Sequence, residues 1–118
     1  FAEMLAADNP SPMNTLSVRG YDLTADIGRL AQAMTVAQAE KKPLFVGEFG
    51  VPGPANGETK EKFAKILAAI ETNRIPLSAL WVFDFDSQAK DWNVTATNGR
   101  SWQLDAIQQA NERMKEKR

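Results

Sequence analysis

A glutamate at the end of an apolar run is the residue of this chain best placed to do chemistry. The run extends from Pro43 to Phe49, with Glu48 as its lone carboxylate and Gly50 directly after it. A run that is apolar on both faces is typical of a parallel strand covered on both sides. An ionised carboxylate is costly to bury unpaired, so we expect Glu48 where the strand opens to water or to a partner. The pattern predicts an acid at the mouth of a cavity; the alternative is a solvated or salt-bridged glutamate at a strand end.

Polar and aromatic residues also end two other apolar runs. Arg19 and Tyr21 come at the end of one run, and Trp81 and Asp84 lie in the other. In barrels of parallel strands, the carboxyl ends and the loops after them build the site. We therefore expect these four residues to lie with Glu48 on one rim. Each also has a structural interpretation: Tyr21 as a loop aromatic, Trp81 as a core residue and Asp84 as a loop acid or hydrogen-bond acceptor.

The composition limits the chemistry that is available. The 118 residues contain no Cys and no His, which excludes disulfides, thiol catalysis, imidazole bases and the usual zinc sites. Acid–base chemistry must then come from carboxylates, from Tyr21 or from the cations. The spacing of Asp84 and Asp86 is too short a pattern to indicate a metal site, and no glycine fingerprint indicates a nucleotide. We therefore expect no metal and no cofactor.

Charge and hydropathy limit the partners in the same way. The formal net charge is −1, which gives no electrostatic case for nucleic acid. No apolar run approaches the roughly 20 residues that a helix needs to span a bilayer. Neither nucleic acid nor a membrane is therefore an expected partner.

The elements that position these residues follow from the hydrophobic pattern. Helical spacing predicts four helices beginning near Phe1, Thr24, Asn56 and Ser101, and apolar runs predict strands over 14–19, 43–49 and 79–85. Thr24 and Ser101 are the expected N-caps of their helices. The order of elements predicts an α/β fold of parallel, right-handed crossover units, in a single segment over residues 1–118.

Alternation along the central strand predicts which side chains share a face. Leu44, Val46 and Glu48 are expected on one face, and the residues between them on the other. Three parallel strands are too few to hide their inner face and both edges. We therefore expect Leu44 and Val46 on an inner face that further strands must cover.

Three segments of the chain resemble a known enzyme family. The segments over 15–21, 42–50 and 79–83, with their Lys-Pro and Gly-Glu-Phe-Gly motifs, are similar in order and spacing to the last three strands of glycoside hydrolase family 5, the cellulase-type barrels. The resemblance covers nearly the whole chain. It implies the C-terminal part of a (β/α)8 TIM barrel, about its last three βα units, and a retaining hydrolase of β-glycosidic bonds.

The resemblance also implies a role for each rim residue. Glu48 matches the catalytic nucleophile, Trp81 the aromatic floor of the sugar subsite, and Tyr21 the tyrosine that hydrogen-bonds the nucleophile. Arg19 stands where the family usually has a histidine, and a fixed cation beside Glu48 favours its ionised form. Arg19 and Asp84 join Trp81 and Tyr21 as expected substrate-binding residues. Asp84 is a poor candidate for the catalytic acid, because no apolar pocket around it is evident.

Retaining hydrolysis needs a second carboxylic acid roughly 5 Å from the nucleophile. The family supplies it from an Asn-Glu pair on the fourth strand, but the pair in this chain is Asn111-Glu112, in the last predicted helix. We therefore expect the acid/base glutamate in a missing N-terminal part and expect the isolated segment to be inactive. The expected partners are an oligo- or polysaccharide and either the missing N-terminal barrel half or a second copy. The family resemblance also implies a secreted or periplasmic protein.

Two other classes of function stay open. In a non-catalytic carbohydrate-binding or assembly module, Trp81 and Tyr21 would bind sugar while Glu48 only hydrogen-bonds its hydroxyls. In a structural half-barrel, the open sheet would pair with a second copy. Trp92 and Trp102 flank a polar loop and are expected either to stack on sugar or to pack the loop against the last helix.

Overall fold

The computed structural model describes residues 1–21 and 26–117, so the predicted cap Thr24 lies outside the described residues. Its elements, in chain order, are α1 (Ala2–Asp8), β1 (Leu16–Gly20), α2 (Asp26–Glu40), β2 (Leu44–Phe49), α3 (Gly57–Thr72), β3 (Leu77–Leu80), the 3-10 helix η1 (Asp86–Gln88) and α4 (Trp102–Glu116). The strands form one parallel sheet in the order β1-β2-β3. The predicted α/β order of helices and parallel strands is confirmed.

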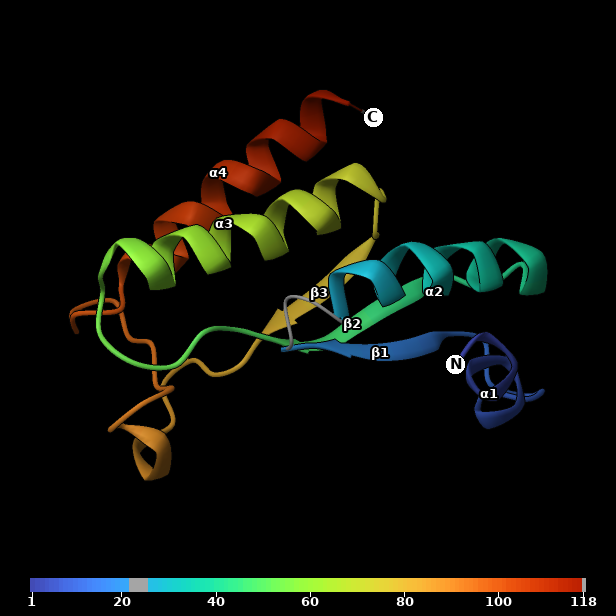
Figure 1. Cartoon of the computed structure of the whole chain (residues 1–118), viewed down its shortest axis with the longest axis horizontal. Helices are drawn as coiled ribbons and strands as arrows, with labels where there is room; N and C mark the ends of the chain where they lie inside the picture. The colour runs from blue at the N-terminus through green and yellow to red at the C-terminus, as the bar shows by residue number, and fades with distance from the viewer. Residues whose placement is uncertain (22–25, 118) are drawn as a thin grey trace.

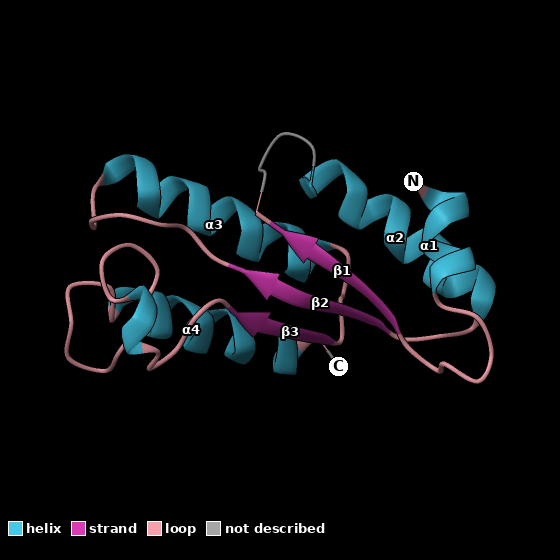
Figure 2. Cartoon of the chain, turned by 90° about the horizontal axis from the view of Figure 1, so that it is seen from below, coloured by secondary structure: helices cyan, strands magenta, loops and turns pink. Residues whose placement is uncertain are grey.

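Three of the helices cover the same side of the sheet. Helices α2, α3 and α4 lie above the strands in Figure 1, and the view from below in Figure 2 shows the strands in front of them. The stripe of α3 that the sequence predicts is buried toward the sheet: Phe63, Ile66, Leu67 and Ile70. The Phe63 ring stacks on that of Phe49 in β2, with ring centroids 5.9 Å apart. The opposite sheet face, which carries Ser17, Arg19 and Phe45, is called the open face below.

The central strand contains a bulge that the alternation does not predict. Gly47 and Glu48 lie opposite the single residue Ala79, because Val46 pairs with Ser78 and Phe49 with Leu80. An extra residue of this kind interrupts the regular alternation of a strand. Phe49 is 2 % exposed and packs in the same core as Val46. The bulge thus moves Phe49 to the helix side of the sheet.

The prediction that Leu44 and Val46 lie on an inner face that further strands must cover is wrong. Both side chains are 0 % exposed and belong to the core that the helices cover. Alternation fails because the bulge separates Glu48 from Val46. Glu48 bonds instead to residues that extend from the open face, as described below. The catalytic candidate therefore lies on the side of the sheet opposite α2, α3 and α4.

The third strand is shorter and begins earlier than the predicted 79–85. β3 ends at Leu80, and the next backbone amide, that of Trp81, donates a 2.8 Å hydrogen bond to the carbonyl oxygen of Phe49. The Trp81–Val82 peptide bond is cis, and Asp84 has a φ of 53°. A positive φ is incompatible with a strand. The apolar residues after Trp81 therefore belong to a loop.

The first residues of α3 and α4 differ in capping, and the N-cap that the sequence predicts at Ser101 is wrong. Asn56 begins α3 with a capping box, in which its side chain accepts from the Thr59 amide and its own amide donates to the Thr59 hydroxyl. Ser101 makes no such bond, and its backbone is already helical. The chain instead enters α4 through a tight turn in which the amide of Gln103 donates to the carbonyl of Arg100, 3.0 Å away.

Candidate functional site

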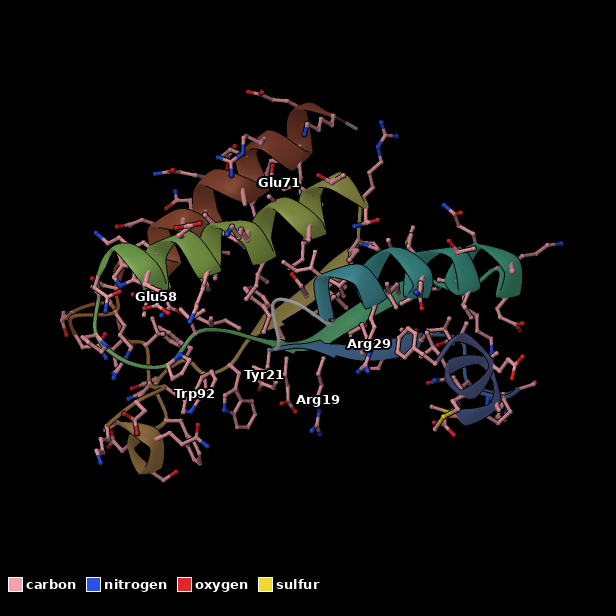
Figure 3. All side chains as sticks on the ribbon, in the orientation of Figure 1. Arg19, Tyr21, Arg29, Glu58, Glu71 and Trp92 are labelled. Atoms are coloured by element: carbon pink, nitrogen blue, oxygen red, sulfur yellow. The ribbon has the colours of Figure 1, made fainter. Side chains whose placement is uncertain are left out.

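Glu48, in β2, lies beside one side chain from the end of β1 and one from the residue just after it. Arg19 pairs with Glu48 across the β1–β2 ladder, and its Nε lies 3.5 Å from Oε1 of Glu48. The Tyr21 hydroxyl donates a 2.5 Å hydrogen bond to Oε2 of Glu48. In Figure 3 the side chains of Arg19 and Tyr21 extend from the sheet on the side away from α3. The structure thus joins three of the five predicted site residues on the open face.

The two neighbours of Glu48 act with different strength. The Arg19 side chain is 73 % exposed and the Glu48 side chain 26 %, so their ion pair is weakened by solvent. The bond from Tyr21 is short and ends on a carboxylate, the kind of hydrogen bond that is strong in proteins. Tyr21 therefore fixes the orientation of the Glu48 carboxylate, while Arg19 adds positive charge beside it.

Tyr21 acts as a donor at neutral pH. Burial raises the pKa of its hydroxyl, and the hydrogen bond to Glu48 and the negative charge of Glu48 raise it further. Arg19 acts in the opposite direction. The hydroxyl therefore stays protonated throughout the physiological range, which excludes Tyr21 as a general base there.

Trp92 is a neighbour of this site whose contact with Tyr21 the sequence did not predict. Its ring meets that of Tyr21 edge-on, with centroids 5.4 Å apart and an interplanar angle of 74°. Trp102 packs edge-on against Phe63 of α3, at 5.3 Å. Trp102 thus packs α4 against α3, a different contact from the expected packing of the loop against the last helix. Trp92 contacts a residue 71 positions earlier (92 − 21), and no local pattern predicts such a contact.

A glycine allows the loops after β2 and β3 to approach each other here. A Cβ atom on Gly50 would overlap the carbonyl oxygen of Trp81 and would lie 3.6 Å from Cζ3 of Trp92. Any larger residue would push these loops apart. Gly50 therefore holds the turn after Glu48 against both tryptophans.

Trp81 follows β3 at the same end of the sheet as Glu48. Its indole Nε1 donates a 2.8 Å hydrogen bond to Oε1 of Gln88, in η1. The side chain is half-buried, so part of the ring remains accessible while its orientation is fixed. Such a ring can serve as a flat apolar platform.

Asp84 is not among the bonded partners of Glu48 in the described residues. Its side chain is exposed, and its backbone amide donates to the carbonyl of Val94 at 2.9 Å. Within residues 1–21 and 26–117, the polar partners of the Glu48 carboxylate are Tyr21 and Arg19. The site as described therefore holds one carboxylate with a hydroxyl donor and a cation.

Other classes of site are not seen in the described residues. No three His, Cys, Asp or Glu side chains there come together as they would around a metal ion. Among the described helices, none has the length and apolar character to cross a membrane.

Comparison with known proteins adds no family. No protein-family model matches the sequence. No curated protein matches it either. The grounds for a functional proposal are therefore the geometry around Glu48 and the resemblance of three sequence segments to family 5.

Proposed function

We propose that this chain is the C-terminal part of a family 5-like (β/α)8 barrel and that Glu48 is the nucleophile of a retaining β-glycoside hydrolase. The observation that carries the proposal is the position of Glu48 at the end of the central parallel strand, hydrogen-bonded by Tyr21 and paired with Arg19. Parallel strands with helices on one side have the layering of a barrel segment, in which strand ends carry the catalytic groups. Oligo- or polysaccharide is the substrate class.

The two oxygens of Glu48 have different tasks in this mechanism. Oε2 accepts the short bond from Tyr21, whereas Oε1 has the longer contact with Arg19. Oε1 is thus the oxygen that attacks the anomeric carbon, while the glycosidic bond breaks and an acid protonates the leaving oxygen. Water then releases the sugar from the glycosyl ester on Glu48.

The acid in this reaction comes from outside the described residues. Retaining enzymes place it about 5 Å from the nucleophile, and the side chains that bond to the Glu48 carboxylate in residues 1–21 and 26–117 are those of Tyr21 and Arg19. We assign it to an N-terminal barrel half or to a second copy of this chain. Trp81, oriented by Gln88, forms the sugar platform in this proposal.

A mechanism-based inhibitor tests the role of Glu48. With the N-terminal half present, a fluorinated β-glycoside should label Glu48, identified by peptide mapping. Glu48→Gln should lose the label and several orders of magnitude of turnover, because it cannot form the glycosyl ester. Glu58→Gln, an exposed glutamate in α3, is the matched control. Label on another residue, or near-normal turnover of Glu48→Gln, would rule the role out.

A carbohydrate-binding module is the second candidate. The observation that favours it is that the bonded partners of Glu48 in the described residues are a hydroxyl and a guanidinium, neither of them a carboxylic acid. Glu48 would then accept hydrogen bonds from sugar hydroxyls while Trp81 stacks on the ring. Oligosaccharide binding that survives Glu48→Gln, without labelling in any combination with the N-terminal half, would decide for this candidate.

A further inference from the structure

The loop between β3 and α4 is held together by one arginine. The Arg100 guanidinium donates from Nε to the carbonyl of Gly53 at 3.1 Å and from one terminal nitrogen to those of Ala89 and Asn93, each at 3.2 Å. Its other terminal nitrogen donates to the carbonyl of Lys90 at 2.5 Å. Gly53 belongs to the loop after β2 and the other three to the loop after β3. Arg100 thus fastens the two loops to each other.

Other hydrogen bonds fix the same segment. The amide of Gly53 donates to the carbonyl of Asp91 at 2.9 Å. The Asn98 side chain donates to the Asn93 carbonyl at 2.8 Å. The Asn93 side chain is 3 % exposed and accepts from the Phe85 amide at 2.8 Å. The segment from Ala89 to Asn93 is therefore held at both ends and in its middle.

Trp92 is carried by this segment. Its backbone amide donates to the carbonyl of Gln88 at 3.1 Å, and its ring meets that of Tyr21. Figure 3 shows Trp92 beside Tyr21 on the side of the sheet away from α3. Tyr21 in turn donates to Glu48. A continuous set of contacts therefore runs from Arg100 through Trp92 and Tyr21 to Glu48.

We propose that Arg100 is a positioning residue for Glu48, because it holds Trp92 against Tyr21 and thereby keeps the Tyr21 hydroxyl on the carboxylate. The proposal rests on the proposed function where it concerns catalysis by Glu48. Its structural half, from Arg100 to Tyr21, can be measured without any turnover. The opposing interpretation is that Arg100 only stabilises the loop and leaves Tyr21 unaffected.

The shape of the guanidinium makes the substitution Arg100→Lys informative. Its planar fork reaches four carbonyl oxygens of two loops at once, whereas a lysine ammonium is a point charge on a flexible stem. Arg100→Lys keeps the charge and most of the apolar stem. The substitution therefore removes the planar set of hydrogen bonds to the four carbonyl oxygens while changing little else.

The titration of Tyr21 reports on its surroundings directly. Tyr21 is the one tyrosine of the chain, so the rise in tyrosinate absorbance with pH belongs to it alone. Glu48 and Arg19 are the charged groups that act on its hydroxyl from the strands. If Arg100→Lys releases Trp92, water reaches the phenol, and the titration midpoint should move down by about one pH unit, toward the ordinary value near 10. Circular dichroism at each pH identifies the range in which the chain is folded.

The control is Arg113→Lys, which alters another arginine that binds across elements, here from α4 to Glu71 of α3. A midpoint that moves in Arg100→Lys and not in Arg113→Lys supports the proposal. An unmoved midpoint in folded Arg100→Lys overturns it. If Arg100→Lys unfolds, Trp92→Leu decides, and an unmoved midpoint again overturns it. Unfolding of both variants also overturns it, since Arg100 then acts on stability alone.

The outcome is separable from that of the proposed function. With the N-terminal half present, Arg100→Lys should also slow labelling of Glu48 by the fluorinated glycoside, by roughly tenfold if the Tyr21 bond is lost. A moved midpoint with no labelling of wild-type Glu48 would retain the Arg100 to Tyr21 coupling and reject the nucleophile. Normal labelling of wild-type Glu48 with an unmoved Tyr21 midpoint in Arg100→Lys would retain the nucleophile and reject the coupling between Arg100 and Tyr21.

Discussion

The Glu48 carboxylate has one half-buried neighbour, Tyr21, and one exposed neighbour, Arg19. The exposed Arg19 guanidinium interacts through water, so dissolved salt weakens its effect on Glu48. The bond from Tyr21 is at a half-buried position and depends on geometry more than on ionic strength. Tyr21 is therefore expected to matter more for the orientation of the Glu48 carboxylate than the cation next to it.

Gln103 presents the opposite situation, a buried polar side chain without partners. It is 1 % exposed, and neither its amide nitrogen nor its amide oxygen has a hydrogen bond among the described residues. An unsatisfied buried polar group costs about 1–3 kcal/mol. Methionine has a similar shape and no amide group that needs hydrogen bonds. Gln103→Met should therefore raise the free energy of unfolding by about that amount. Urea denaturation at neutral pH measures the change.

The same substitution at Gln109, an exposed position of α4, is the control and should change the stability little. Loss of stability in Gln103→Met would mean that the amide is satisfied by a group outside the described residues. Gln103 would then not be an unsatisfied buried amide.

At the scale of elements, α3 and α4 are joined by a bidentate ion pair. Arg113 donates from Nε to one Glu71 oxygen at 3.0 Å and from a terminal nitrogen to the other at 2.7 Å. These hydrogen bonds lower the pKa of Glu71. A carboxyl group whose folded pKa is lowered stabilises the fold above its unfolded pKa, ordinarily about 4.3, and this contribution is lost as pH falls through the folded value.

We therefore expect the effect of Arg113→Gln on stability to depend on pH. The urea midpoint of the variant should lie below that of the wild type at neutral pH, and the two should converge in acid, below the folded pKa of Glu71. Glu71→Gln should show the same convergence, because either change removes the same pair. A difference that persists unchanged in acid would assign the effect to packing of the Arg113 stem.

The hydrophobic pattern predicted the order of helices and strands because each element has its own period. Phe63 and Ile70 show this in α3, where both are buried as the spacing predicts. The pattern could not predict the bulge at Gly47 and Glu48, since an extra residue is defined only by pairing with neighbouring strands. The end of β3 at Leu80 was missed for a similar reason: apolar residues continue, but the backbone turns.

The candidate site was predictable in its residue types and less so in its contacts. Arg19 and Glu48 lie near the ends of β1 and β2, and Tyr21 just after β1. Parallel topology brings these strand ends together. Trp92 and Arg100 act through contacts between distant loops. Such contacts depend on tertiary structure, and no local spacing encodes them.

At the scale of the whole molecule, exposed apolar surface lies along the outer edge of β3. Leu77 is 59 % exposed there, and Phe83 and Phe85, in the following loop, are 55 % and 45 % exposed. A groove of about 500 Å³ separates this edge from α4 and includes Leu104 and Ile107 in its lining. β1 and β3 are both edge strands. The apolar surface that another chain or segment would cover therefore lies at the sheet edges. Leu44 and Val46 need no such cover, because the helices already bury them.

The last prediction follows from these edges and from the lone carboxylate. Each 100 Å² of apolar surface removed from water is worth about 2.5 kcal/mol, and unpaired strand edges favour pairing with another chain. The 118-residue chain on its own should therefore associate with itself and hydrolyse no glycoside, because the bonded partners of Glu48 in the described residues, Tyr21 and Arg19, include no carboxylic acid. Size-exclusion chromatography with light scattering, at several concentrations and beside an activity assay with and without the N-terminal half, checks both statements. A compact, active monomer at every concentration would show that this chain is a complete small enzyme and would overturn the barrel proposal.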